Sequence, residues 1–497
     1  MKRTVLFLLL ILISAVYCFG QKETWNWVFG DKAGLSWRPE NLRSFAAKGI
    51  DGTPDAVLQN LPSSFSTSIN NLEGVFSISD KEGNLLFYSN GIKIWNGEDK
   101  VIYRTLGGHD SSSQSGIVVP YPGDDKKYIC IGLGWHFADN MGYVLVEADS
   151  PTDVTVNGGR TEFSGHTGPL GESMSAIMHA NGEDWWIVAP GKGQFICFNA
   201  WLATKAGVKS SNPVKTPTTI NYKDKTIGSC GYLKFTSDGK HFVWGTWREN
   251  KLIYGDFDNN TGQFSNIRYQ ENHGAYGIEF SPNQKYLYTA LTEPSPPSSS
   301  HTGIGVYIWD LEALLKGTAT TYLRKISNGF SRPQALQLDV SGRIWVTDNY
   351  TGTRNMFLID NPDNLKDLKI YKLVNFLARG SKAKMGLPSF SATFLKIFGD
   401  KGFCVNFPKE FETLIPQVIQ GSEVAYTRWN WGDGEAEEIV KGNGTQKLTH
   451  RYIRADNYII TITAYGNDDK QIGPSKTMDI VVYSCVLPVN PNIHFMR

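Results

Sequence analysis

The sequence has few of the residues and motifs that mark catalytic, metal-binding or nucleic-acid-binding proteins. Its 497 residues include 6 cysteines and 9 histidines, with no Cys-x-x-Cys and no His-Glu-x-x-His pattern. Without such spacing, neither a metal site nor a redox-active thiol pair is predicted. Basic residues (49) and acidic residues (48) balance, so no excess charge is available to attract nucleic acid. We therefore expect no cofactor, no metal and no nucleic-acid partner.

Long apolar runs are also scarce, and the one that is present lies at the N-terminus. Val5–Val16 (VLFLLLILISAV) follows two basic residues and is short for a membrane span. Together with small Gly20 it predicts a secretory signal peptide over residues 1–20. A lipoprotein anchored at Cys18 is the alternative. We expect an exported protein without a transmembrane span, located in the periplasm, at the outer membrane or on the cell surface.

Export permits disulfides, and five cysteines remain after residue 20. An odd number leaves at least one thiol free. Cys404 and Cys485 bracket the last part of the chain and are the best candidates for a pair. Buried free thiols are an equal possibility for Cys130, Cys197 and Cys230.

What the sequence does contain is a repeated hairpin. Aromatic residues make up 12% of the chain and there are 50 glycines, a composition that favours strands joined by tight turns. A short apolar strand, a polar turn and an aromatic-rich strand recur every 40 to 60 residues, roughly one four-stranded propeller blade per repeat. The predicted turns centre near Gly83, Asp124, Gly182, Gly239, Gln284 and Gly342. We predict an all-β protein whose residues 21–400 form a β-propeller.

Closing the ring requires strands from both ends of this region. WNWVFG (Trp25–Gly30) is expected to pair near IYKLVNFL (Ile370–Leu377) and GLPSF (Gly386–Phe390). With the six clear hairpins, this gives seven blades, although six or eight remain open. SPPSSSH (Ser295–His301) is interpreted as a loop within a blade, and EALLKG (Glu312–Gly317) as a short helix.

The pattern changes after residue 400. Residues 458–463 (YIITIT) alternate as a half-buried strand does, and several such short strands follow one another. We predict an immunoglobulin-like sandwich over residues 401–486, followed by a tail, residues 487–497.

Two acidic turns raise the question of calcium. Gly432-Asp433-Gly434 is followed by EAEEIV, which does not space oxygen ligands as a calcium loop does. Strands follow it, whereas a phosphate-binding loop is followed by a helix. DFDNNTG (Asp256–Gly262) lacks the glycine position and the downstream glutamate of a calcium loop. Both stretches are predicted to be strand-connecting turns.

The small domain resembles a PKD domain. The residues that carry this resemblance are Trp429-Asn430-Trp431-Gly432-Asp433-Gly434, Thr449-His450-Arg451-Tyr452 and Tyr458-Ile459-Ile460. The preceding region is similar to the propellers of exported Bacteroidetes proteins, in which a propeller precedes a PKD domain. That similarity is carried by FGDKAGLSW (29–37), EGVFSISDKEGNLLFYSNGIKIWN (73–96), SSSQSGIVVPYP (111–122) and YGIEFSPNQKYLY (276–288). Many members are associated with gliding motility or type IX secretion, and the resemblance implies an accessory role there.

Candidate binding residues come from the start of each inner strand. The residues expected there are Glu73, Gln114, Ser175, Gly231, Tyr276 and Gln334. Only one is a carboxylate, whereas a glycosidase needs two, so we predict that the protein is not an enzyme. Glu73, Gln114, Tyr276 and Gln334 form instead a polar and aromatic set suited to a peptide or a sugar. Trp135 and Trp247 follow blade strands, where exposed tryptophans suit sugar stacking or a protein interface.

These observations support three hypotheses about function. The first is a non-catalytic protein-interaction module of the cell envelope, with envelope or secretion-system proteins as partners. The second is a glycan-binding adhesin of the cell surface, and the third is a propeller glycosidase or lyase. Two carboxylates about 5 to 10 Å apart in the channel would favour the enzyme, and a flat apolar patch would favour a protein partner.

Overall fold

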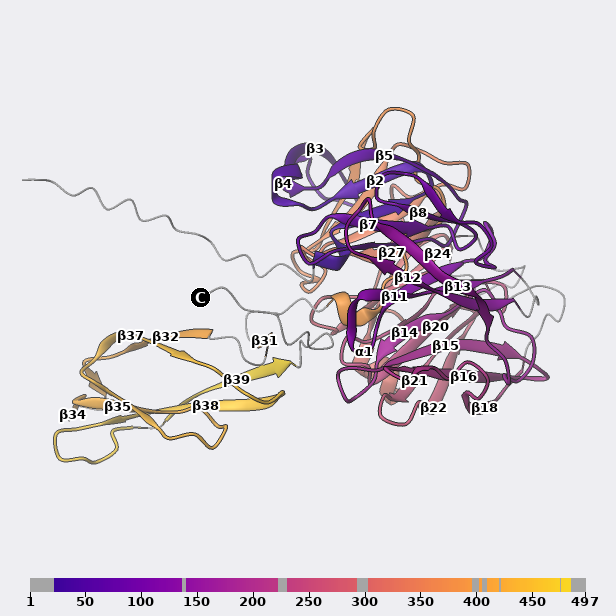
Figure 1. Cartoon of the computed structure of the whole chain (residues 1–497). Coiled ribbons are helices and arrows are strands. Elements are labelled where there is room, and N and C mark those ends of the chain that lie inside the picture. Colours follow the sequence, from indigo (N-terminus) through magenta and orange to yellow (C-terminus); the bar gives the residue numbers. More distant parts are fainter. Residues whose placement is uncertain are drawn as a thin grey trace, which may run out of the picture.

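The computed structural model describes residues 22–135, 140–221, 230–292, 303–395, 402–404, 409–419, 422–473 and 475–483. Figure 1 shows two units, a large body built from strands of residues 22–395, here called the ring, and a smaller unit from residues 402–483. The predicted signal peptide, the predicted boundary at residue 400 and the loop Ser295–His301 lie outside the described residues. None of the described helices is long and apolar enough to cross a membrane.

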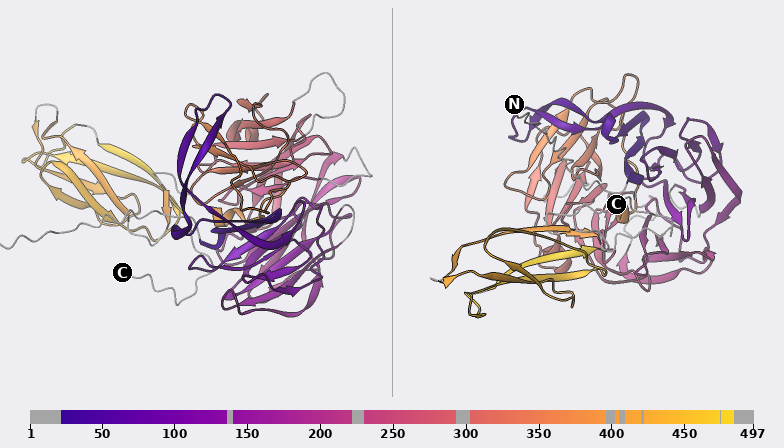
Figure 2. Two further views of the ribbon diagram at one scale, coloured as in Figure 1. Left: turned by 90° about the horizontal axis from the view of Figure 1, so that it is seen from above. Right: turned by 60° about the vertical axis from the view of Figure 1, so that its left-hand side comes forward.

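The ring consists of antiparallel sheets arranged around a common axis, as the right-hand view of Figure 2 shows. Its first meander contains β6 (Phe76–Ser79), β7 (Leu85–Ser89), β8 (Ile94–Asn96) and β9 (Val101–Tyr103). The second contains β10 (Gly116–Tyr121), β11 (Asp124–Leu133), β12 (Met141–Ala148) and β13 (Val154–Glu162). The third contains β14 (Ser175–Met178), β15 (Trp185–Lys192), β16 (Phe195–Thr204), β17 (Gly207–Val208) and β18 (Val214–Asn221).

Two further meanders repeat the same plan. One contains β19 (Leu233–Phe235), β20 (His241–Thr246), β21 (Lys251–Asp258) and β22 (Gln263–Glu271). The other contains β23 (Gly277–Phe280), β24 (Tyr286–Leu291), β25 (Gly305–Asp310) and β26 (Arg324–Ile326), with helix α1 (Leu311–Lys316) after β25. Asp310 caps α1 by accepting a hydrogen bond from Ala313 N, and Gly317 ends the helix with a φ of 73°. This confirms the predicted short helix.

The two ends of the ring region are joined by strand pairing. The sheet of β27 (Pro333–Leu338), β28 (Ile344–Asp348), β29 (Met356–Asp360) and β30 (Lys369–Leu373) continues into β3 (Arg43–Ile50) and β4 (Ala56–Leu61). The remaining sheet contains β1 (Asn26–Phe29), β2 (Asp31–Ser36) and β5 (Ser63–Asn70). Short 3-10 helices are η1 (Lys22–Thr24), η2 (Pro39–Asn41) and η3 (Ala392–Leu395).

The predicted closure is right in principle and wrong in one pairing. Strand β30, which contains the first residues of IYKLVNFL, pairs with β3 through Lys48 and Lys372 rather than with WNWVFG. Strand β1 pairs only with β2 among the described strands, and Asp31 of β2 bridges Lys382. The physical reason is that β3 extends the outer edge of the last meander, while β1 occupies an inner position.

The predicted hairpin turns are confirmed with one shift. Positive φ values occur at five of the predicted centres, Gly83, Gly182, Gly239, Gln284 and Gly342. In the second meander the turn residue is Gly123, with a φ of 78°, and Asp124 is already the first residue of β11. These positions lie in the left-handed backbone region, which glycine enters at no steric cost and which Gln284 adopts with a φ of 57°.

The smaller unit has two layers with its own core between them. One sheet runs in the order β31 (Gly402–Cys404), β39 (Lys476–Tyr483), β38 (Asp456–Tyr465), β35 (Tyr426–Asn430) and β36 (Glu438–Lys441). The second layer pairs β32 (Lys409–Ile415) with β37 (Gly444–His450), and β33 (Val418–Ile419) pairs with β34 (Ser422–Glu423). Trp429 and Trp431 are buried in this core, and the Gly432-Asp433-Gly434 stretch is a strand-connecting turn as predicted.

Candidate functional site at the centre of the ring

The starts of the inner strands meet at one end of the ring axis. Backbone hydrogen bonds join neighbouring sheets there: Glu73 N to Asp110 O (3.0 Å), Gln114 N to Glu172 O (3.0 Å), Tyr232 N to Tyr276 O (2.9 Å), Ala335 N to Met385 O (3.2 Å) and Met385 N to Leu72 O (3.0 Å). A Cβ on Gly277 would lie 1.9 Å from Gln334 O, so glycine is required for this approach. The backbones therefore close tightly around the axis.

Glu73 is at the centre of this end. Its side chain is buried, and its Oε2 accepts a hydrogen bond from the Tyr276 hydroxyl (2.7 Å) while its Oε1 accepts one from Ser111 Oγ (3.0 Å). Burial raises the pKa of Glu73 to about 8, and the negative charge of Glu172 raises it further, against the hydrogen bonds that lower it. At neutral pH Glu73 therefore carries a proton that it can donate.

A second carboxyl group, Glu172, lies close enough to act electrostatically on Glu73. It is fully buried and hydrogen-bonds Cys230. Burial raises the pKa of the Cys230 thiol, and the charges of Glu172 and Glu73 add to this effect. Cys230 is thus a neutral thiol at physiological pH and not an activated nucleophile.

Aromatic residues flank the carboxyl groups on two sides. The Trp247 ring lies edge-on to Tyr276, with 6.1 Å between ring centroids, and the Arg248 guanidinium lies over Trp247 at 4.1 Å. On the other side Trp135 stacks on His109 at 5.0 Å. His109 Nδ1 accepts a hydrogen bond from the backbone N of Ser111, whose hydroxyl binds Glu73. An unbroken series of contacts therefore runs from Trp135 to Trp247 through the carboxyl group.

Both candidate tryptophans are distinguished by their exposure. Twelve of the 14 tryptophans are buried, mostly between sheets, and the two exceptions are Trp135 and Trp247. Trp135 is 40% exposed, and Trp247 is half-buried. These two tryptophans, which follow blade strands, are therefore the ones that retain solvent-exposed ring surface.

The four predicted polar residues are brought together, but not as an open mouth. Glu73, Gln114, Tyr276 and Gln334 are each no more than 6% exposed, so the prediction that they line an exposed opening is wrong. Their side chains lie under tightly closed backbones. Both amide atoms of Gln114 hydrogen-bond the Leu233 backbone: Oε1 accepts from Leu233 N (2.7 Å) and Nε2 donates to Leu233 O (3.3 Å). Neither amide atom of Gln334 has a hydrogen-bond partner among the described residues.

Sequence reasoning missed Glu172 because the start of its strand was placed at Ser175. The structure shows that Glu172 precedes β14 by three residues, as Glu73 precedes β6. If the residue three positions before each inner strand had been compared, instead of the first strand residue, Glu172 would have been identified as the second carboxylate.

Further along the axis, a buried ion pair has a structural role. Lys234 Nζ donates to Glu279 Oε2 (2.7 Å), Gln337 Oε1 (2.9 Å) and Leu336 O (3.0 Å), which satisfies all three of its donors. Glu279 Oε2 also accepts from Leu338 N at 2.7 Å. The pair links three inner strands, and none of the ammonium protons is left to bind a ligand.

Metal and disulfide chemistry have little support in the described part of the chain. No three His, Cys, Asp or Glu side chains are grouped to hold a metal there. Cys130, Cys197 and Cys230 are free thiols. Cys485 and the side chain of Cys404 lie outside the described residues, so the predicted pair stays a prediction.

Comparison with known proteins gives a fold and no family. No protein-family model and no curated protein matches the chain. Among solved structures, the β-propeller domain of Myceliophteria thermophila Cps50 (Swd1) has a TM-score of 0.38 at 11% identity, over 69% of this chain and 95% of that one. A periplasmic gluconolactonase of Pseudomonas aeruginosa has a TM-score of 0.36 at 10% identity, over 83% and 97%. A Bacteroides uniformis protein, provisionally titled a 6-phosphogluconolactonase, has a TM-score of 0.35 at 12% identity, over 83% of this chain and 96% of that one. The chain is all-β and propeller-like.

The prediction that the protein is not an enzyme is wrong. It rested on finding a single carboxylate among the residues that open the inner strands, and the structure places Glu172 beside Glu73. The ground on which catalysis was excluded, a single carboxylate, therefore fails.

Proposed function

We propose that the chain is a carbohydrate-acting hydrolase whose site is the Glu73–Glu172 carboxyl pair. The observation that carries the proposal is that two buried carboxyl groups interact at the ring axis. A pair of carboxyl groups in different environments is the usual machinery for cleaving a glycosidic bond. Here Glu73, with a pKa of about 8, is the general acid that protonates the leaving oxygen.

The surrounding residues support a sugar as substrate. Tyr276 and Ser111 orient the Glu73 carboxyl group through hydrogen bonds to its two oxygens. Glu172 takes the second role, as base or nucleophile. Trp135 and Trp247 offer aromatic faces, on which the C–H face of a pyranose stacks.

The test is turnover by the purified protein of aryl glycosides of the common hexoses, with glucono-δ-lactone in the same panel. Glu73→Gln and Glu172→Gln keep the side-chain shape and remove the acid, so kcat is expected to fall by about 100-fold or more. Glu82→Gln, an exposed change in the β6–β7 turn, is the matched control and should retain full activity. Absence of turnover across the panel, or unchanged kcat in Glu73→Gln, would refute the proposal.

The finer assignments of fold and location are also proposals. The sheet β1-β2-β5 with the segment around Lys382 supports a seventh blade. The tryptophan turn and the hydrogen bond from Tyr452 Oη to Trp431 O (2.7 Å) support a PKD domain in the smaller unit. The N-terminal pattern supports export, and the resemblance to exported propeller–PKD proteins supports a place at the envelope. Attachment of an epitope tag and cell fractionation would test this location.

A further inference from the structure

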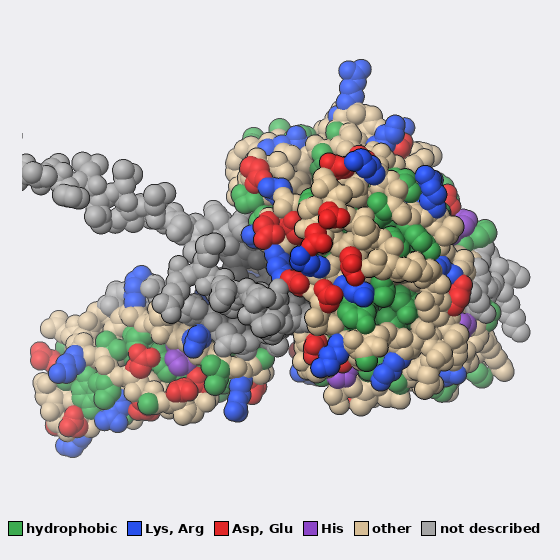
Figure 3. All heavy atoms as spheres, viewed as in Figure 1, with side chains coloured by type: hydrophobic (Ala, Val, Ile, Leu, Met, Phe, Trp, Pro, Cys, Tyr) green, Lys and Arg blue, Asp and Glu red, His purple; other side chains and the backbone are tan. Residues whose placement is uncertain are grey.

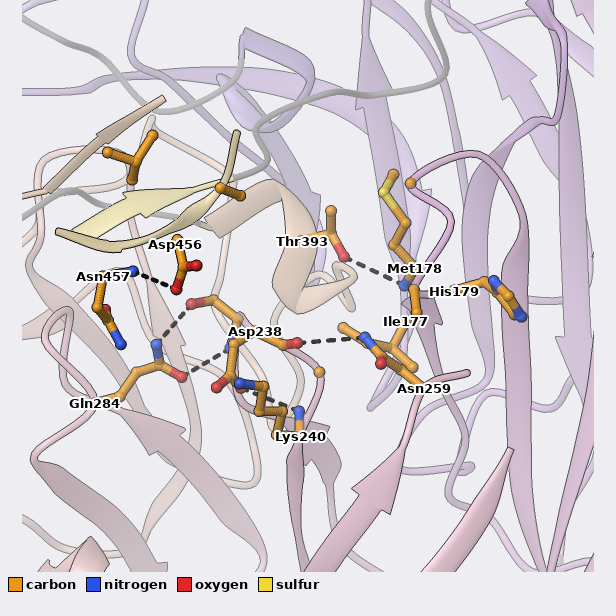
Figure 4. Close-up of a pocket in the computed structure, with 16 residues that line it drawn as sticks. Ile177, Met178, His179, Asp238, Lys240, Asn259, Gln284, Thr393, Asp456 and Asn457 are labelled. Carbon is orange, nitrogen blue, oxygen red and sulfur yellow. Dashed lines mark hydrogen bonds between the residues drawn. The ribbon is translucent and has the colours of Figure 1, made fainter. Parts of the chain in front are cut away.

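A cavity of about 510 Å³ lies between the two units, and neither Glu73 nor Glu172 lines it. Figure 4 shows its two walls. The ring contributes hairpin turns of three successive meanders, including Asp238, Lys240 and Gln284, and the smaller unit contributes Asp456 and Asn457. A volume in this range is typical of small-ligand sites, which span about 300–1,000 Å³.

The ring wall is held rigidly by hydrogen bonds between meanders. Gln284 Oε1 accepts from Ser237 N (2.9 Å) and its Nε2 donates to Ser237 Oγ (2.7 Å). Asn259 O accepts from Ala180 N (3.0 Å), which joins the β14–β15 and β21–β22 turns. Asp238 Oδ1 accepts from the backbone N of Lys240 (3.0 Å). Such a wall needs little ordering when a ligand binds.

Several polar groups on these walls remain available. The Lys240 ammonium and the Asn457 side-chain amide take part in no hydrogen bond or ion pair found among the described residues, and Asp238 uses only one of its carboxylate oxygens. Beside them Met178 and Val482 add apolar surface. The cavity therefore offers donors, acceptors and an apolar side together.

This combination favours a neutral sugar over an anionic or a purely apolar ligand. A phosphate ligand is disfavoured because Asp238 and Asp456 outnumber the single lysine. A purely apolar ligand would leave the polar groups unpaired. Sugar hydroxyls both donate and accept hydrogen bonds, and the C–H face of a pyranose suits the apolar side.

We propose that this cavity is a second, non-catalytic binding site for a neutral oligosaccharide, which contacts both the ring and the smaller unit. The site does not depend on the carboxyl pair at the ring axis, because no residue of that pair lines it. Its role is to hold a glycan chain, one part of which contacts the ring while another part contacts the smaller unit.

The experiment is isothermal titration of the full chain with three trisaccharides, cellotriose, maltotriose and triacetylchitotriose. At least one is expected to bind, and Lys240→Ala and Asn457→Ala should each weaken it by about fivefold or more, the loss expected for one hydrogen bond. Lys285→Ala is the matched control, because Lys285 has the same place in the next hairpin turn but does not line the cavity. Its affinity should equal that of the unmodified protein.

A variant of the carboxyl pair separates the two sites. Glu73→Gln should bind the trisaccharide with unchanged affinity even where it abolishes turnover. Binding that is lost in Glu73→Gln and kept in Lys240→Ala would overturn the second site, because the sugar would then occupy the ring axis. Lack of binding by all three trisaccharides at millimolar concentration would overturn it as well. Retained binding without any hydrolysis would support this site while refuting the proposed enzyme.

Discussion

At the residue scale, Glu73 shows how burial and hydrogen bonding compete. Two hydroxyl groups donate to its oxygens and favour the charged form, yet burial and the Glu172 charge prevail. In the unfolded chain the group has an ordinary pKa of 4.5, against about 8 in the fold. The folded state thus binds the Glu73 proton more tightly than the unfolded chain does. The resulting stabilisation of the fold is complete below pH 4.5 and is lost as the pH rises through 8.

This predicts a pH-dependent effect of Glu73→Gln on stability. Relative to the variant, the unmodified protein should lose stability between pH 4.5 and 9, by on the order of 5 kcal/mol. Chemical denaturation of both proteins across this range measures the difference. Glu23, whose pKa burial raises to about 7, titrates in both proteins and cancels in the comparison. Parallel stability curves for the two proteins would contradict the raised pKa of Glu73.

The same titration predicts the shape of the activity profile. Because the proposed general acid must be protonated, kcat should fall as the pH rises through about 8. A profile that rises through this range would assign Glu73 the role of base instead.

At the scale of elements, the hairpin turns show how a local motif acquires a long-range role. In most turns an Asp or Asn side chain only caps nearby backbone amides, as Asp124 does for Lys126 N. Asp339 does this for Ser341 and, in addition, its Oδ2 accepts from Trp345 Nε1 (2.7 Å) and Trp37 Nε1 (3.1 Å). Trp37 follows β2, so this one carboxylate links the N-terminal strands to the last meander.

We therefore predict that Asp339→Ala is far more destabilising than Asp124→Ala. The first change leaves two buried indole N–H groups without an acceptor, at about 1–3 kcal/mol each. The second removes one exposed cap and should cost about 1 kcal/mol or less. Urea denaturation followed by tryptophan fluorescence measures both. Equal losses would show that Asp339 has no part in closing the ring.

At the scale of the whole molecule, the two units have separate cores. The core of the smaller unit includes Trp429 and Trp431, and no residue of the ring belongs to it. Within it Trp431 stacks on His450 with 4.3 Å between ring centroids, and His450 Nε2 lies 2.7 Å from Asp433 Oδ2. Both acidic and basic side chains lie on the face of each unit seen in Figure 3.

Separate cores predict two unfolding transitions in calorimetry. Trp431→Ala should destabilise the smaller unit by about 3–5 kcal/mol and lower only its transition temperature, because it removes a buried indole from that core. Trp135→Ala, at an exposed position of the ring, should move neither transition appreciably. A single transition that Trp431→Ala shifts as a whole would show that the units unfold together.

Much of this architecture follows from the sequence because it depends on neighbours along the chain. Alternating apolar residues, aromatic strands and turn glycines such as Gly83 and Gly342 determine the repeated hairpins locally. The pairing of β30 with β3 could not be derived this way, because it joins segments at the two ends of the ring.

The site itself was decided by tertiary structure. Tyr276 and Glu73 are 203 residues apart in the chain, and only closure of the ring brings the hydroxyl to the carboxyl group. The same closure buries Glu73, sets Glu172 beside it and so raises its pKa. The cavity between Lys240 and Asn457 needs both units in place. Local patterns determine which strands and turns form, whereas distances between distant residues, and the burial that governs their chemistry, exist only in the assembled fold.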